Sequence, residues 1–216
     1  MIKKFSDFQI ENPYKAFVYT RHFYYFDFPK SLNLTFINLV RHPVDRFVSK
    51  FYYRQVGFTH DKSKNATNLL SINKCLQEAD DHPDKYFRIV CKNGGDWSYV
   101  PYFCGRDPVC LKPTREALEK AIHNIRKHYL IVGTLENYTQ FLELAEILIP
   151  RIFEGAADFN KASKWIRNYS KTTYKEAISG EMREHLMSTN KMKLEIELYN
   201  FIKKRFRSQL YEYRLL

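Results

Sequence analysis

The chain has 216 residues, 44% of them hydrophobic and 16% aromatic, which is enough to bury a sizeable core. Its 35 Lys and Arg residues against 24 Asp and Glu residues give a net charge of +11, which favours an anionic partner. The sequence shows no nucleic-acid-reading motif, no run of about 18 apolar residues and no apolar signal-peptide core, so we expect no nucleic-acid partner, transmembrane span or signal peptide.

A first short strand is predicted at residues 15–20, KAFVYT, and it leads into an aromatic run that ends at Phe28. His22 follows this strand almost directly. In an α/β sheet, ligands bind outside the carboxyl ends of the strands. The residues alone therefore leave two interpretations open, a histidine packed among aromatic rings or a histidine that faces a ligand.

The most informative stretch is residues 34–57, LTFINLVRHPVDRFVSKFYYRQVG. Its apolar start is typical of a buried parallel strand. Pro43 fits the first position of a helix, and apolar residues then recur at helical spacing. Arg41 lies at the carboxyl end of the strand, and Ser49 lies about two turns up the helix. A forked guanidinium and a hydroxyl at such a junction could together hold an anion.

Four cysteines allow two disulfides in three possible pairings, or four reduced thiols. Cys104 and Cys110 enclose a tight loop with Gly105 and Pro108, which a disulfide could close. No C-x-x-C motif and no histidine at zinc-ligand spacing accompanies them, so no metal site is predicted. Among the four N-glycosylation sequons, Asn65 is the candidate if the protein is secreted, because it lies in a polar stretch.

The second half repeats the strand–helix alternation. Thr114 is expected to cap a helix that ends near His128, and residues 129–133 form a second buried strand. Asn137 and Gln140 resemble a capping box that opens a helix through Leu148. This order predicts an α/β domain with a parallel sheet, extending over residues 1–216 as a single unit.

Two basic stretches close the chain. Residues 161–175, KASKWIRNYSKTTYK, have little apolar periodicity and are predicted to form a solvated surface loop. A long amphipathic helix is predicted over residues 181–210. Its basic residues form a solvated face that could also contact a polysaccharide: Lys203, Lys204, Arg205 and Arg207.

The strand ending in R-x-P, with Arg five and Ser eight residues after Arg41, resembles the 3′-phosphate-binding segment of sulfotransferases that use 3′-phosphoadenosine 5′-phosphosulfate (PAPS). The strings YTRHFYYFDF, INLVRHPVDRFVSKFYYRQVG and VPYFCGRDPVC are similar to the glycosaminoglycan hexuronyl 2-O-sulfotransferases, particularly the uronyl and heparan sulfate 2-O-sulfotransferases and their insect relatives. The resemblance spans residues 14–210. It implies a sulfotransferase-type, P-loop-like parallel sheet flanked by helices.

The resemblance also implies roles for individual residues. His22 corresponds to the catalytic base, and Arg41 and Ser49 correspond to the residues that bind the 3′-phosphate of PAPS. The basic loop resembles one that closes over the adenine and the 3′-phosphate, through Trp165, Arg167, Lys171 and Thr172. The implied disulfides are Cys75–Cys91 and Cys104–Cys110.

Two features depart from the family pattern. His42 stands where the family usually has Asp, and a favoured acid near the helix start is thereby lost. The family also begins with a strand and a loop that grips the 5′-phosphosulfate, and neither is found ahead of His22. Losing one central electrostatic donor costs about 10²–10³ in rate, so we expect this difference to matter for activity.

The resemblance implies sulfo transfer from PAPS, without a metal, to the 2-hydroxyl of a hexuronic acid in an acidic glycosaminoglycan such as heparan, dermatan or chondroitin sulfate. It also implies a homotrimer in the Golgi lumen, normally held by an N-terminal type II membrane anchor that this chain does not contain. The alternatives are a non-catalytic polyanion-binding remnant or isoform and a nucleic-acid-binding module, which would show a steep dependence on salt.

Overall fold

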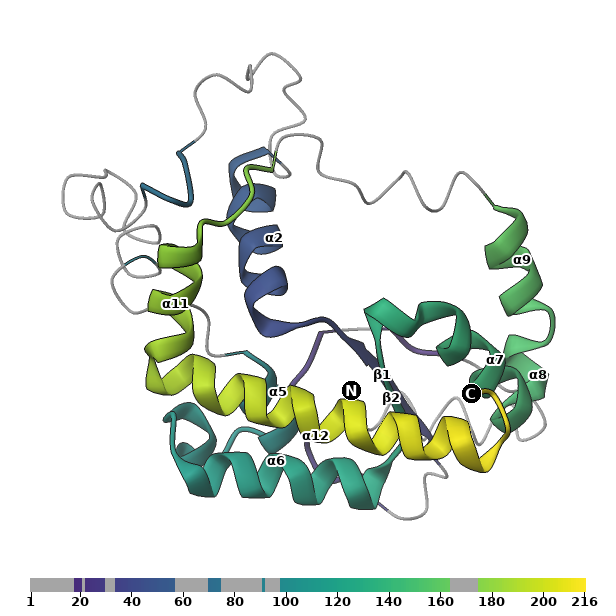
Figure 1. Ribbon diagram of the computed structural model, residues 1–216. Coiled ribbons are helices and arrows are strands. Elements are labelled where there is room, and N and C mark those ends of the chain that lie inside the picture. The colour runs from purple at the N-terminus through teal and green to yellow at the C-terminus, as the bar shows by residue number, and fades with distance from the viewer. Residues whose placement is uncertain are drawn as a thin grey trace.

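The computed structural model describes residues 18–20, 22–29, 34–56, 70–74, 91, 98–163 and 175–216. Within these ranges, β1 (Phe36–Val40) and β2 (Tyr129–Thr134) form a two-stranded parallel sheet. Val40 pairs with Thr134, so the carboxyl ends of both strands lie at the same edge. Helices surround the sheet, as Figure 1 shows, and the predicted α/β class is confirmed.

The junction after β1 forms as the sequence predicted. Helix α2 (Pro43–Val56) begins at Pro43, whose missing N–H would have no partner in a first helical turn. Phe47, Phe51 and Tyr52 are buried, and they pack with residues of α11 (Gly180–Ser188) in one apolar cluster. The expected helix stop, Gly57, lies outside the described residues.

The second strand–helix unit also follows its sequence signals closely. Helix α6 (Arg115–His128) is capped by Thr114, whose side chain accepts a hydrogen bond from the backbone N–H of Ala117 at 3.3 Å. After β2 come a 3-10 turn, η3 (Leu135–Asn137), and helix α7 (Tyr138–Leu148). The predicted capping box is wrong, because the Asn137 side chain accepts from the Thr134 hydroxyl at 3.2 Å and caps no helix N–H.

Two other predictions need correction. Residues 18–20, the described part of the predicted first strand, form no strand. The predicted helix over 181–210 is two helices, α11 and α12 (Asn190–Glu212), which meet at a bend (Figure 1). Thr189 between them has an extended backbone, and its side chain accepts from the N–H of Met192 at 3.4 Å. The apolar periodicity runs through this break because both helices bury a face.

Short helices complete the described architecture. They are α5 (Tyr99–Cys104), η2 (Pro108–Leu111), α8 (Pro150–Phe153) and α9 (Ala156–Ala162), none of which was predicted. Helix α12 contacts β2, α2, α5, α6 and α11. It therefore packs against the elements that surround the carboxyl end of β1. Among the described helices, none is both long and apolar enough to cross a membrane.

Candidate functional site

The turn between β1 and α2 is held by side chains from two other parts of the chain. The backbone N–H of Arg41 donates to the hydroxyl oxygen of Tyr99 at 2.9 Å. The next N–H, that of His42, donates to Oε1 of Glu136 at 3.0 Å. Backbone N–H groups at such a junction have no partner within the strand or the helix. These two hydrogen bonds therefore fix the backbone of Arg41, from which its side chain extends.

Lys175 lies beside Ser49 and within electrostatic range of Arg41. The Lys175 ammonium donates to the Ser49 hydroxyl at 3.2 Å. Burial, and secondarily the positive charge of Arg41, lowers the pKa of Lys175. Lys175 therefore contacts Ser49 and lies near enough to Arg41 for their charges to interact, and it is a second cation that the sequence analysis did not select.

The chemistry of this cluster suits a phosphate group. Within the described residues, neither Arg41 nor Lys175 forms an ion pair with a carboxylate. Two partly buried cations near each other repel, and an anion between them would remove that cost. A guanidinium and an ammonium can only donate hydrogen bonds, and a hydroxyl can rotate to donate one. A phosphate monoester needs donors of this kind, because its oxygens accept hydrogen bonds.

The signal that could have identified Lys175 was present in the sequence. It ends the basic loop 161–175, two residues after the K-T-T string from which Lys171 and Thr172 were selected. Those two residues, with Trp165 and Arg167, lie outside the described residues. Their predicted part in cofactor binding stays a prediction.

Behind this turn, α12 supplies a buried carboxylate. Glu195 is 1% exposed, and its two oxygens accept from the backbone N–H groups of Ser98, Tyr99 and Val100 at 2.8–3.0 Å. Burial raises the pKa of Glu195 to about 7, although the three N–H donors and Arg46 pull it the other way. The guanidinium of Arg46 lies 4.9 Å from the centre of the Tyr99 ring.

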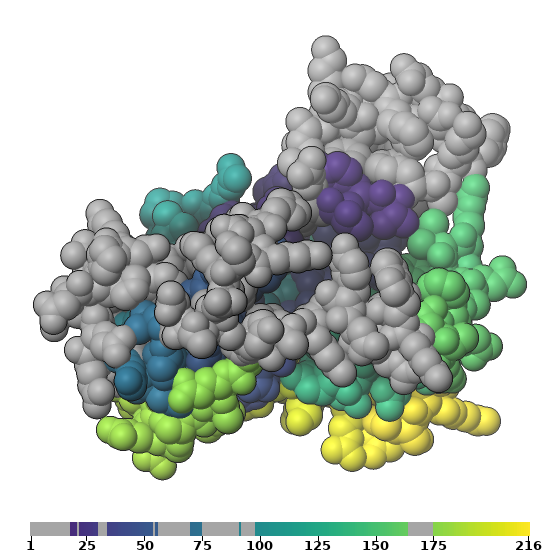
Figure 2. Space-filling model, turned by 90° about the horizontal axis from the view of Figure 1, so that it is seen from above, coloured from purple at the N-terminus to yellow at the C-terminus, as the bar shows by residue number. Residues whose placement is uncertain are grey.

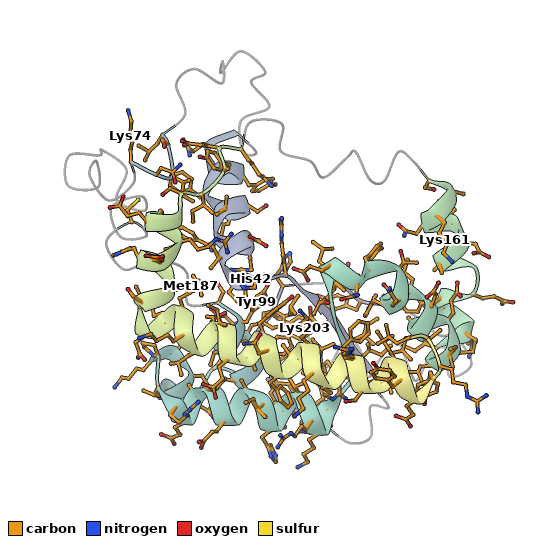
Figure 3. All side chains as sticks on the ribbon, viewed as in Figure 1. His42, Lys74, Tyr99, Lys161, Met187 and Lys203 are labelled. Carbon is orange, nitrogen blue, oxygen red and sulfur yellow. A yellow bond between two sulfur atoms is a disulfide. The ribbon has the colours of Figure 1, made fainter. Side chains whose placement is uncertain are left out.

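His42, where the resemblance led us to expect Asp, lies at the turn before α2. Its ring meets the Tyr199 ring edge-on at 5.2 Å, and Lys203 of α12 lies close enough to influence its charge (Figure 3). Burial lowers the pKa of His42, and its buried Nδ1 atom has no partner among the described residues. A carboxylate reaches this point from another part of the chain, because Glu136 accepts the His42 N–H and also the Tyr199 hydroxyl at 3.1 Å.

His22 is exposed and lies on a segment, residues 22–29, that has no regular secondary structure. The purple residues, 18–20 and 22–29, reach the surface in Figure 2. The segment is anchored at Tyr25, whose N–H donates to the carbonyl of Tyr102 in α5 at 2.7 Å and whose ring lies 5.1 Å from that of His128. Among the described residues, no hydrogen bond or ion pair joins His22 to the Arg41 cluster.

The YFCG string explains how this segment is seated. Gly105 has φ +121°, and a Cβ atom on it would lie 3.1 Å from the carbonyl oxygen of Tyr25. Glycine therefore allows the close approach of the His22 segment to the end of α5. A disulfide joins Cys104 to Cys110 across a Cα separation of 5.5 Å and closes the loop that follows.

The remaining predicted residues are only partly described. Cys91 is buried and disulfide-bonded, whereas Cys75, its predicted partner, lies outside the described residues, as does Asn65. No group of three or more metal-ligating side chains occurs within the described part of the chain.

The sequence of this chain is similar to those of known proteins. Residues 2–202 match the model of the Sulfotransferase family. The chain is 30% identical to a human uronyl 2-sulfotransferase over 209 residues, 91% of this chain and 48% of the relative. It is 28% identical to heparan sulfate 2-O-sulfotransferase 1 of Cricetulus griseus over 204 residues, 90% of this chain and 54% of the relative.

A heparin sulfate O-sulfotransferase of Drosophila melanogaster is 29% identical over 195 residues, 87% of this chain and 53% of the relative. The chain thus spans about half the length of the curated relatives that it matches. Because the family match covers almost all of the chain and the strand–turn–helix that carries Arg41 and Ser49 forms as the resemblance implied, the protein belongs to the sulfotransferase family.

Proposed function

We propose that the protein transfers a sulfo group from PAPS to the 2-hydroxyl of a hexuronic acid in a glycosaminoglycan. The observation that carries the proposal is the cluster of Arg41, Ser49 and Lys175 at the carboxyl end of β1. It offers the donors that a 3′-phosphate requires. The names of the relatives, uronyl 2-sulfotransferase and heparan sulfate 2-O-sulfotransferase, support the acceptor class.

In the proposed reaction, His22 acts as the general base. A sugar hydroxyl is a poor nucleophile, and a neutral imidazole can take its proton as the new S–O bond forms. The bond between sulfur and the bridging phosphate oxygen breaks, and 3′-phosphoadenosine 5′-phosphate leaves with the electron pair. Negative charge grows on the leaving phosphate, so fixed cations and N–H donors must be in place before the reaction begins.

The proposed partner is an acidic polysaccharide, which the net charge of +11 suits. We also propose, from the resemblance, that the protein acts in the Golgi lumen as a homotrimer.

The first test is calorimetric titration of 3′-phosphoadenosine 5′-phosphate into the parent chain, Arg41→Ala and Lys175→Ala. We expect loss of Arg41 to weaken binding about 100-fold and loss of Lys175 about tenfold, because each removes a charge-assisted hydrogen bond to the phosphate. Arg115→Ala is the matched control, since Arg115 is 60% exposed and pairs with Glu197 on the surface.

A transfer assay with radiolabelled PAPS and desulfated heparan sulfate follows, with His22→Ala expected to abolish transfer and to leave nucleotide affinity unchanged. If the folded parent binds no nucleotide, the proposed function is wrong. Tight binding of heparan sulfate without the nucleotide would then favour a non-catalytic polyanion-binding protein.

A further inference from the structure

The buried carboxylate of Glu195 does more than fill a core position. Its three hydrogen bonds go to the first N–H groups of helix α5, those of Ser98, Tyr99 and Val100. Ser98, the residue before the helix, makes no side-chain cap of its own. The capping oxygens of α5 therefore come from another helix, 95–97 residues further along the chain, and they fix where α5 begins.

The first residue of α5 is Tyr99, and its side chain links the start of α5 to the turn after β1. Its hydroxyl oxygen accepts the Arg41 N–H at 2.9 Å, and its ring lies against the Arg46 guanidinium. Both arginines flank the start of α2, where the proposed phosphate site lies. His42 and Tyr99 lie together at this point, above α12 (Figure 3).

We propose that Glu195 is a positioning residue for nucleotide binding, which acts through Tyr99 on the backbone of Arg41 and so places the Arg41 guanidinium for the 3′-phosphate. This inference rests on the proposed function of Arg41. Glu195 touches no ligand in this scheme. Its effect travels over two hydrogen-bonded steps, from carboxylate to helix start and from tyrosine hydroxyl to backbone N–H.

The physical reason is that a guanidinium binds phosphate through directional, paired hydrogen bonds. A shift of the Arg41 backbone by even part of an ångström misaligns them. Without the Tyr99 hydroxyl, the Arg41 N–H also loses its acceptor, and the turn can move to regain one from water. A carboxylate that served the core alone would affect global stability but would not act through Tyr99.

A double-mutant cycle separates these two roles. Nucleotide affinity is measured for Glu195→Gln, Tyr99→Phe and the double variant. We expect each single variant to weaken binding about tenfold, because the amide cannot accept all three N–H bonds and the phenyl ring accepts none. The double variant should lose little more than either single one, since both act on the same path.

Matched controls come from the same regions. Glu197→Gln changes an exposed glutamate two residues after Glu195, and Tyr211→Phe removes an exposed hydroxyl that bonds to Arg207. Both should bind the nucleotide within about twofold of the parent. The proposal is wrong if Glu195→Gln and Tyr99→Phe bind the nucleotide as tightly as the parent, or if the losses of the two single variants add fully in the double variant. Provided that the parent binds the nucleotide, the proposed function still stands in either case.

A second readout needs no ligand. Hydrogen exchange of the Arg41 amide should accelerate about tenfold in Tyr99→Phe and in Glu195→Gln, while amides in β2 keep their protection. Unchanged exchange at Arg41 would overturn the proposal even if the parent failed to bind nucleotide. If Glu195→Gln does not fold, Glu195→Asp replaces it, with a shorter carboxylate and the same expected direction.

Discussion

The turn that carries Arg41 and the segment that carries His22 are attached to opposite ends of the same helix, α5. At its start, Tyr99 accepts the Arg41 N–H, and Glu136 takes the next N–H, so consecutive backbone donors are bound by side chains. At its end, one backbone bond from Tyr25 and a close approach at Gly105 seat the His22 segment. Among the described residues, the turn at Arg41 is therefore held by more hydrogen bonds to the rest of the chain than the segment that carries His22.

The difference teaches that the two halves of the proposed site can be perturbed separately. A phosphate site gains from donors that are placed in advance. The His22 segment depends instead on its aromatic side chains: Tyr25 is 6% exposed and the Phe28 ring lies 5.4 Å from that of Phe36, whereas Tyr24 is 40% exposed. Changes at the two ends of α5 should therefore affect different steps.

The largest effect is expected from Tyr25→Ala. Removing this buried ring should lower the free energy of unfolding by about 3–5 kcal/mol, measured by urea denaturation. Where the fold persists, sulfo transfer should fall at least about tenfold while nucleotide affinity stays within about twofold, since only the His22 segment is released.

Tyr24→Ala is the control for this variant, and as an exposed substitution it should change stability by about 0.5 kcal/mol or less. Equal losses of nucleotide binding and of transfer in Tyr25→Ala would mean that the two halves of the site are not independent.

The pH dependence of stability sharpens the comparison at the other end of α5. The folded-state pKa of Glu195 is raised to about 7 from 4.5, so its contribution to stability is full below pH 4.5 and is lost as the pH rises through 7. Between pH 4 and pH 8, the parent should lose about 3 kcal/mol relative to Glu195→Gln, as followed by denaturation at each pH. A constant difference between the two proteins would show that the buried carboxyl does not titrate in this window.

A smaller effect is expected from Gly105→Ala. The positive φ and the contact with the Tyr25 carbonyl should together cost about 1–3 kcal/mol, and transfer should fall with little change in nucleotide affinity. Gly180→Ala is the control, because an added Cβ there meets nothing within 4 Å. Equal stability of Gly105→Ala and the parent would remove the steric explanation for glycine in the YFCG string.

Much of the fold near the site could be predicted from local rules. The β-branched run, Pro43 and the apolar spacing after it determine β1 and α2, and Thr114 determines the start of α6. Arg41 and Ser49 could be placed at one site for the same reason, because one strand, one turn and one helix connect them. Lys175 could be selected as a candidate from its basic stretch, but it could not be placed beside Ser49, since the two are 126 residues apart and no periodicity relates them.

The sequence by itself determined which segments become strands and helices where capping residues and periodicity agree, and it selected Arg41 and Ser49 for the proposed anion site. Only the tertiary structure decided that α11 and α12 separate at Thr189, that residues 18–20 stay irregular and that Glu195 is buried. Local propensity acts over a few residues, whereas burial and hydrogen bonds between distant segments depend on the packed chain. Glu195 follows Leu194 in an ordinary helical pattern, and its role arises because the start of α5 packs against that face.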